Sequence, residues 1–175
     1  MNLPGGPTKD EIIAVSLAKL SLQSSDIVTD IGCGTGRVAV EAAKRVRKVY
    51  AVDLRNEAVI CTRDLARSSG ITNIKIQQGH GADLIEELPH IDAAFIGGSR
   101  DLSKVLSLLS EKKVRSVVVN AVLLSTLHEA VTTMQELTIF KEVLHVSVSR
   151  SSPLAGGLML RPLDPVYIIV GGCLC

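Results

Sequence analysis

The feature that most constrains the fold is a glycine-rich turn that follows a short apolar run. Residues 26–31 include the apolar residues Ile27, Val28 and Ile31, and they lead directly into Gly-Cys-Gly-Thr-Gly at residues 32–36. Glycines allow positive φ angles and let a ligand approach the backbone closely. A helix that begins after such a turn presents free N–H groups at its amino terminus. The pattern therefore predicts a buried strand, a ligand-binding turn and a helix.

The chain continues as an alternation of strand-like and helix-like segments. The first helix is expected to follow Thr8 and to include Leu20. We then expect strands at residues 26–31, 49–54, 74–77, 91–96 and 114–119. The helices expected between and after these strands span residues 36–46, 56–69, 82–88, 101–110 and 125–137. Thr8 with Glu11 has the spacing of a capping box, Asn56 and Ser125 are expected caps, and Gly70 is expected to close a helix. This alternation predicts an α/β fold with a mostly parallel sheet, helices on both faces, and ligands at the carboxyl ends of the strands.

The last part of the chain has a different pattern. Residues 141–150 alternate in polarity, residues 151–165 contain three prolines and two glycines, and residues 166–170 are mostly apolar. We interpret this as two antiparallel strands joined by a long loop at the end of the sheet. Their apolar content predicts burial, in part in a subunit contact. No repeat or linker interrupts the sequence, so we expect one domain over residues 1–175.

Composition excludes several classes of function. Hydrophobic residues make up 46% of the chain and charged residues 21%, which is enough apolar material for a core. A net charge of +1 and an aromatic content of 2% disfavour a nucleic-acid partner. The chain has no apolar run of about 18 residues, which predicts no membrane association. Four cysteines without a C-x-x-C pair, and no signal-peptide pattern, predict a cytoplasmic protein without disulfides.

The charges around the glycine turn indicate the kind of ligand. A dinucleotide fingerprint, G-x-G-x-x-G, would need a third glycine where Arg37 stands, and a phosphate-binding P-loop is absent. Asp30 would repel a pyrophosphate and suits a cationic or zwitterionic ligand. Asp53, at the end of the next strand, can accept hydrogen bonds from both hydroxyls of a ribose. We therefore favour a nucleoside without phosphates, the alternative being a plain tight turn with Asp53 as a cap before Asn56.

Other reactive residue types do not form a recognisable constellation. His80 lies between two glycines and is either a group with a role in chemistry or a polar turn residue. Cys33 is either a reactive thiol at a helix amino terminus or a small filler, and we favour the filler. No histidine pair has the spacing of metal ligands, so no metal site is expected. Arg100, Arg150 and Arg161 are either solvated surface charges or partners for a carboxylate ligand.

Residues 28–36 and residues 49–53 together resemble the seven-stranded S-adenosylmethionine-dependent methyltransferases. The resemblance extends over nearly the whole chain. More narrowly, the chain resembles the decarboxylating cobalt-precorrin-6B C15-methyltransferases of cobalamin biosynthesis. The stretches that carry this narrower resemblance are residues 6–9, 95–99, 120–122, 146–150, 153–154 and 164–166.

This resemblance implies a Rossmann-like seven-stranded sheet, S-adenosyl-L-methionine as cofactor and S-adenosyl-L-homocysteine as product. It implies that the methionine part lies on residues 32–36, that Asp53 holds the ribose and that residues 79–81 border the adenine. The implied cofactor-binding residues are Thr8, Gly32, Cys33, Gly34, Thr35, Gly36, Asp53 and Gly81. The implied substrate is a corrinoid tetrapyrrole, methylated at a ring-linking carbon with loss of carboxylate from an acetate arm, and the implied assembly is a homotetramer. A chain without a fused second methyltransferase is typical of the cobalt-first, anaerobic branch.

The chain also departs from the family pattern. His80 and Gly81 stand where the family has an acid and alanine, and Arg100 and Asp101 replace glycines. A neutral imidazole can accept a hydrogen bond from an adenine amino group through one nitrogen only. No residue is predicted as a catalytic acid or base. Three alternatives stay open: a methyltransferase for RNA or protein, a non-catalytic S-adenosylmethionine-binding subunit, and a nicotinamide-dependent oxidoreductase.

Overall fold

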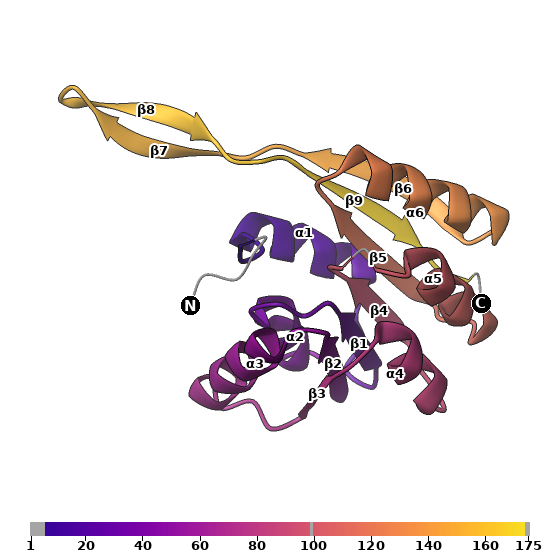
Figure 1. The fold of residues 1–175 in the computed structure, drawn as a ribbon. Coiled ribbons are helices and arrows are strands. Elements are labelled where there is room, and N and C mark those ends of the chain that lie inside the picture. Colours follow the sequence, from indigo (N-terminus) through magenta and orange to yellow (C-terminus); the bar gives the residue numbers. More distant parts are fainter. Residues whose placement is uncertain (1–5, 99, 174–175) are drawn as a thin grey trace.

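A computed structural model describes residues 6–98 and 100–173 of the chain, and its centre is a seven-stranded sheet (Figure 1). The strands follow the order β3-β2-β1-β4-β5-β9-β6. Neighbours among β1 to β5 pair in parallel, whereas β9 is antiparallel to both β5 and β6. The seven strands are β1 (Ile27–Ile31), β2 (Lys48–Asp53), β3 (Ile74–Gln78), β4 (Ala93–Ile96), β5 (Ser116–Ala121), β6 (Phe140–Val146) and β9 (Val166–Gly171). The predicted α/β fold with an antiparallel end is thus confirmed.

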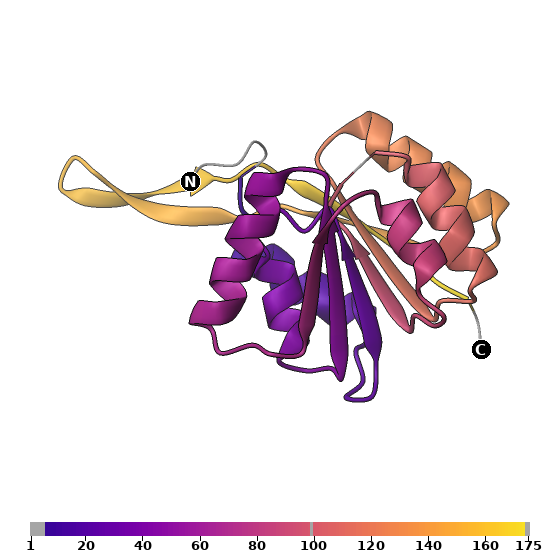
Figure 2. The same cartoon turned by 60° about the horizontal axis from the view of Figure 1, so that its bottom comes forward.

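Six helices cover the two faces of this sheet in the described part of the chain (Figure 2). One face carries α1 (Asp10–Leu20), α2 (Arg37–Ala43) and α3 (Asn56–Ser68), and the other carries α4 (Gly81–Glu87), α5 (Leu102–Glu111) and α6 (Leu124–Glu136). Successive residues of a strand point to opposite faces, so Val28 packs with α1 and α2, whereas Ile31 packs with α4 and α5. A sheet covered on both sides needs strands that are apolar throughout, as residues 117–119 are.

The predicted helix caps are wrong, except for the glycine. Among the described residues, no side chain caps α1, α3 or α6, and Lys9, Arg55 and Leu123 occupy the N-cap positions. Glu11, the expected partner of Thr8, is instead engaged by an arginine from the far end of the chain. Gly70 follows α3 with φ +68, as expected of a closing glycine.

The region expected to be a long loop is a two-stranded arm instead. Strands β7 (Ser149–Leu154) and β8 (Gly157–Pro162) pair with each other and project away from the main sheet (Figure 1). The two turn residues, Ala155 and Gly156, both have positive φ, as a tight two-residue hairpin turn requires. The prolines do not prevent pairing, because both strands of a two-stranded sheet are edges with one unpaired side.

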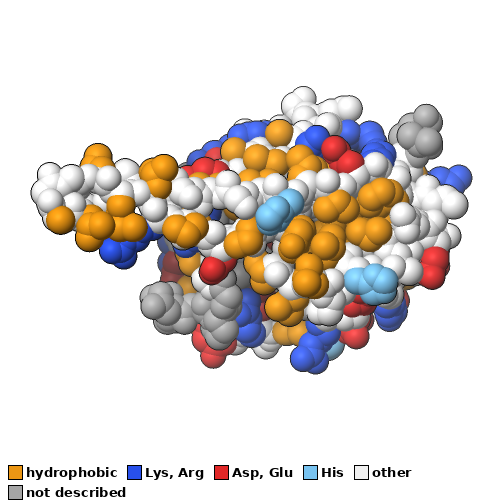
Figure 3. Space-filling model, turned by 90° about the horizontal axis from the view of Figure 1, so that it is seen from above, with side chains coloured by type: hydrophobic (Ala, Val, Ile, Leu, Met, Phe, Trp, Pro, Cys, Tyr) orange, Lys and Arg blue, Asp and Glu red, His pale blue; other side chains and the backbone are white. Residues whose placement is uncertain are grey.

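Burial of the C-terminal strands is uneven. Strand β9 lies between β5 and β6 and is buried as predicted, but β6 is the last strand of the sheet and is mostly exposed. The arm exposes apolar side chains along its length (Figure 3). Its most exposed ones are the arm leucines, Leu154, Leu158 and Leu160, at 55%, 77% and 69%. Within one chain, therefore, the expected burial of this region is not achieved.

Candidate active site

A cavity of about 350 Å³ opens at the carboxyl ends of the parallel strands. Strands β1 and β4 are adjacent there, although the chain passes through β2 and β3 between them, which is the point where ligands bind in such sheets. The walls come from the ends of β1 and β2, the turn before α4 and the turn before α5. The lining residues are Ile31, Gly32, Val52, Asp53, Leu54, Arg55, Gly79, His80, Gly81, Ala82, Gly97, Gly98, Arg100, Asp101 and Val105.

The three glycines of the turn after β1 are needed for different structural reasons. All have positive φ, of +76 at Gly32, +57 at Gly34 and +78 at Gly36. A Cβ atom on Gly32 would lie 2.6 Å from the backbone nitrogen of Gly98, and one on Gly36 would lie 2.7 Å from a Thr62 side-chain carbon. A Cβ atom on Gly34 would meet no described atom nearer than 3.9 Å. Gly32 and Gly36 therefore serve packing, whereas Gly34 leaves an open backbone surface.

Asp53 links this turn to the end of β2. Its Oδ2 accepts hydrogen bonds from the Gly34 amide at 2.9 Å and from Nη2 of Arg55 at 3.1 Å. Its Oδ1 accepts from the backbone nitrogen and from Nε of Arg55, both at 3.0 Å. Burial alone would raise the pKa of this carboxyl, but the bonds from Arg55 and Gly34 hold its pKa below the ordinary value. Asp53 is therefore a carboxylate at neutral pH, and Arg55 occupies acceptor positions that ribose hydroxyls would use.

Asp30 directly precedes Ile31, which lines the cavity, and its side chain is almost completely buried. Both of its carboxylate oxygens lack a hydrogen-bond partner among the described residues. Burial raises the pKa of Asp30 to about 7, and the nearby negative charge of Asp53 contributes in the same direction. A buried acid two residues before the glycine turn disfavours a phosphate ligand and suits one that carries positive charge.

Cys33 is enclosed rather than reactive. Its side chain is buried, and its sulfur lies 3.4 Å from Oγ1 of Thr62. Burial raises the pKa of the thiol to about 12. A thiol with so high a pKa is not a nucleophile at neutral pH, in agreement with the prediction that Cys33 is a filler.

The structure brings only part of the predicted set to the cavity wall. Gly32, Asp53 and Gly81 line the cavity, and Gly34 is joined to it through its hydrogen bond to Asp53. The remaining predicted residues, Thr8, Cys33, Thr35 and Gly36, are not among its lining residues. Thr8 is held at the start of α2, because Nη1 of Arg37 donates to its carbonyl oxygen at 2.7 Å.

Sequence reasoning missed Arg55 and treated Asp101 only as a departure from the family pattern. Arg55 follows a strand-end acid by two residues, a spacing that could have suggested the contact with Asp53. Asp101 is the N-cap residue of α5, and its Oδ2 lies 3.7 Å from Nδ1 of His80. Because residues 80 and 101 belong to different crossovers, no local pattern indicates that they meet.

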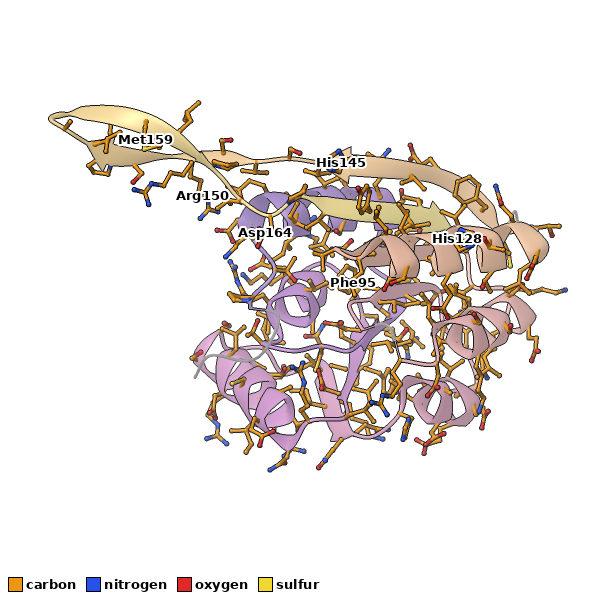
Figure 4. All side chains as sticks on the ribbon, turned by 45° about the horizontal axis from the view of Figure 1, so that its top comes forward. Phe95, His128, His145, Arg150, Met159 and Asp164 are labelled. Atoms are coloured by element: carbon orange, nitrogen blue, oxygen red, sulfur yellow. The ribbon has the colours of Figure 1, made fainter. Side chains whose placement is uncertain are left out.

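The three candidate arginines have different positions. Arg100 lines the cavity, whereas Arg150 at the base of the arm reaches back to α1 (Figure 4), where its Nη2 donates to both carboxylate oxygens of Glu11 at 2.9 and 2.7 Å. Arg161 is paired opposite Arg150 in the arm. In the described ranges, no three histidine, cysteine or acidic side chains are grouped closely enough to hold a metal ion. No helix in the same ranges is long and apolar enough to cross a bilayer.

The donor and acceptor set of this site fits S-adenosylmethionine. Asp53 is a carboxylate acceptor at the end of β2, Gly34 leaves an open backbone surface beside it, and Asp30 is a buried acid two residues before the glycine turn. Apolar side chains of Val52, Leu54 and others line the adjoining wall, where a flat base can pack.

Comparisons with known proteins agree with this geometry. Residues 4–171 match the model of a family described as the precorrin methyltransferase domain. A protein of Methanosarcina acetivorans named probable cobalt-precorrin-6B C(15)-methyltransferase (decarboxylating) is 47% identical, over 98% of this chain and 96% of that protein. A protein of Methanocaldococcus jannaschii with the same name is 33% identical, over 93% and 88%.

Two solved structures of proteins with precorrin-related names also resemble this chain. A crystal structure titled precorrin 8W decarboxylase, from Methanobacterium thermoautotrophicum, has a TM-score of 0.92 and 30% identity, over 98% of this chain and 96% of that one. A precorrin-6y C5,15-methyltransferase from Geobacter metallireducens has a TM-score of 0.91 and 28% identity, over 98% and 94%. Since the family model matches residues 4–171 and a relative is 47% identical over 98% of the chain, this chain belongs to the precorrin methyltransferase family.

Proposed function

We propose that this protein uses S-adenosylmethionine to methylate carbon 15 of cobalt-precorrin-6B and removes carboxylate from an acetate arm of the same substrate. The observation that carries the proposal is the cavity where the turn after β1 meets Asp53 at the end of β2. The names of relatives at 47% and 33% identity state this reaction, which supports the choice of substrate and of the methylated carbon.

We assign cofactor binding to the eight residues that the family resemblance implies, with Asp53 on the ribose and Gly34 under the methionine part. Gly32 and Gly36 act on the ligand indirectly, because their missing side chains let the turn pack on Gly98 and Thr62. Arg55 has to release at least one oxygen of Asp53 before both ribose hydroxyls can donate to this carboxylate.

When bound, S-adenosylmethionine supplies a methyl group that its sulfonium already activates. The protein then has to hold the accepting carbon in line with that methyl group at close contact, so positioning accounts for much of the rate. Arg100, on the cavity wall, is placed to pair with a carboxylate of the substrate. Loss of carbon dioxide leaves an electron pair on the substrate, and the electron-poor macrocycle accepts it, so this step needs no enzyme nucleophile.

We further propose that residues 1–175 act as one methyltransferase domain and that the protein assembles as a homotetramer. The arm leucines support the assembly, because a two-stranded ribbon with exposed apolar side chains is marginally stable unless something covers it. The proposed cover is a second copy of this chain.

The first test is calorimetric titration of the purified protein with S-adenosylmethionine and, separately, with NADH. Binding of S-adenosylmethionine alone is expected, and the next measurement is carbon dioxide release and methyl gain on cobalt-precorrin-6B. Binding of NADH alone would refute the proposal in favour of an oxidoreductase. Binding of S-adenosylmethionine with neither methyl gain nor carbon dioxide release would favour a non-catalytic binding subunit.

A further inference from the structure

The loop after β5 exposes three consecutive apolar residues, which we call the β5 ledge. Val122, Leu123 and Leu124 are 63%, 60% and 68% exposed, and no other run of three large apolar residues in the described ranges is exposed in this way. Figure 3 shows that apolar side chains gather over α6 and beside the base of the arm. Connecting loops are ordinarily polar, and a run of exposed apolar residues is unfavourable unless a ligand or partner covers it. Folding alone therefore does not account for the composition of the β5 ledge.

The residue at the start of α6 leads to the same conclusion. Leu123 occupies the N-cap position with φ −94° and ψ 136°, the extended conformation of an ordinary N-cap. Serine, threonine, asparagine and aspartate are preferred there because their side chains accept a hydrogen bond from the helix backbone, whereas Leu123 makes no such bond. An exposed leucine thus stands where a polar residue would stabilise the helix. Positions that break a local rule without a structural gain are commonly functional.

Sheet pairing places the β5 ledge next to the cavity. Strands β4 and β5 are parallel neighbours, and their last paired residues are Ile96 and Val119. The two chain segments therefore leave the sheet side by side, about 5 Å apart. Gly97 and Gly98 follow Ile96 and line the cavity, and the β5 ledge begins three residues after Val119. The helices that follow, α5 and α6, also pack against each other, so the ledge adjoins this wall of the cavity.

A positive charge lies in the neighbouring turn. Arg100 lines the cavity between β4 and α5, and it forms no ion pair with a described residue. An apolar surface beside an unpaired guanidinium suits a ligand that is apolar at its centre and anionic at its rim. A tetrapyrrole with carboxylate arms has this composition. A ledge-to-ledge contact between two copies of this chain would instead enclose two Arg100 side chains without a described partner, which is unfavourable.

We propose that the β5 ledge is the surface against which the face of the tetrapyrrole macrocycle packs, with Arg100 paired to one of its carboxylate arms. The inference rests on the proposed function and deepens it, because it names residues that hold the substrate rather than the cofactor. The ledge residues contribute apolar contact and no chemistry. They therefore act on the affinity for the substrate and leave the affinity for the cofactor unchanged.

The test uses the double variant Leu123→Ser/Leu124→Ser. Serine is a favourable N-cap at position 123, so the variant is expected to unfold at an equal or higher temperature than the wild type. The KM for cobalt-precorrin-6B should rise at least about tenfold, as the loss of about half the burial of two leucines implies. Binding of cobyrinic acid, a stable corrin with carboxylate arms, should weaken by a similar factor in absorbance titration. The kcat and the calorimetric affinity for S-adenosylhomocysteine should stay within about twofold of wild type.

Three controls accompany this variant. Leu123→Met/Leu124→Met keeps the apolar surface and should keep the wild-type KM. Ile60→Ser is the matched control, because Ile60 is an apolar residue of α3 with 39% exposure that is not among the lining residues, and it should leave the KM unchanged. Light scattering of Leu123→Ser/Leu124→Ser should give the wild-type molar mass.

The outcomes separate the two proposals. No binding of S-adenosylhomocysteine, or no turnover of cobalt-precorrin-6B, by the wild-type protein would overturn the proposed function, and this inference with it. Wild-type turnover with an unchanged KM in Leu123→Ser/Leu124→Ser would overturn the inference alone. A lower molar mass of this variant would also overturn it, because the β5 ledge would then be a subunit contact. An equal loss of affinity for S-adenosylhomocysteine would do the same, because the ledge would then act on the whole site.

Discussion

Replacing Gly34 by alanine tests whether a ligand approaches the turn after β1. The backbone at Gly34 has φ +57, so any side chain there is strained by about 1–2 kcal/mol. Alanine also lowers the conformational entropy of the unfolded chain, which offsets about 0.4–1 kcal/mol of this loss in stability. The added Cβ atom would lie 3.9 Å from Nη2 of Arg55, an ordinary contact. We therefore expect Gly34→Ala to lose only about 1 kcal/mol of unfolding free energy.

Gly70→Ala is the matched control, because the chain offers a second open glycine with the same backbone conformation. Gly70 has φ +68 and no described atom within 4 Å of an added Cβ, and it lies at the end of α3 away from the cavity wall. The same loss of about 1 kcal/mol is expected there. Gly36→Ala should lose more, by about a further 1–3 kcal/mol, because its Cβ atom would lie 2.7 Å from a Thr62 side-chain carbon.

Gly34→Ala and Gly70→Ala are expected to differ in ligand affinity although their losses of stability are similar. If the methionine part of the cofactor lies on Gly34, the new methyl group crowds it at a cost of about 1–3 kcal/mol, or roughly 5- to 150-fold in affinity. Urea unfolding measures the stabilities, and calorimetric titration with S-adenosylhomocysteine measures the affinities. Wild-type affinity in Gly34→Ala would refute the assignment of this turn to the cofactor. An equal loss in Gly70→Ala would show that affinity follows stability rather than contact.

Three further predictions concern Arg55, Asp30 and the arm. Arg55→Met should bind S-adenosylhomocysteine about five- to tenfold more tightly in calorimetry, because the guanidinium no longer competes for Asp53, and weaker binding would show that Arg55 contacts the ligand. The pKa of Asp30 is raised to about 7, so the native state holds its proton more firmly than the unfolded state. This contribution to stability is complete below about pH 4 and is lost as the pH rises to about 7, by up to about 4 kcal/mol. Urea unfolding at pH 5 and pH 8 should therefore show a larger decline for the wild type than for Asp30→Asn, and equal declines would contradict the shift. Changing the arm leucines to serine should reduce the molar mass measured by light scattering, and an unchanged mass would place the subunit contact elsewhere.

The parallel core could be predicted from the sequence because its signals are local and repeated. Strands β2, β4 and β5 are short, largely apolar runs, each followed by a helix, and burial on both faces requires such runs. The helix caps could not be predicted, because tertiary contacts replaced them. Glu11 has the spacing of a capping partner for Thr8, yet Arg150 engages it from a residue far along the chain. The hairpin arm was missed for a related reason: Pro153 and Pro162 indicate a loop unless the paired strands are known to be edges.

For the candidate site, too, the contacts that follow from the fold class could be predicted, whereas a contact between two separate loops could not. Gly32 and Asp53 directly follow or end neighbouring parallel strands, whose carboxyl ends meet at one edge of the sheet, so their proximity follows from the fold class. The contact between His80 and Asp101 depends instead on where two separate crossovers return to the sheet.

Even within one motif, sequence spacing does not distinguish a glycine that serves packing from one that leaves room for a ligand. Gly32, Gly34 and Gly36 all have positive φ, yet neighbouring atoms exclude a side chain only at Gly32 and Gly36 within the described structure. Gly34 is therefore the position where a folding requirement explains the glycine least well, since alanine there would cost the fold only about 1 kcal/mol. The space above Gly34 is, on this reasoning, the part of the turn that belongs to the ligand.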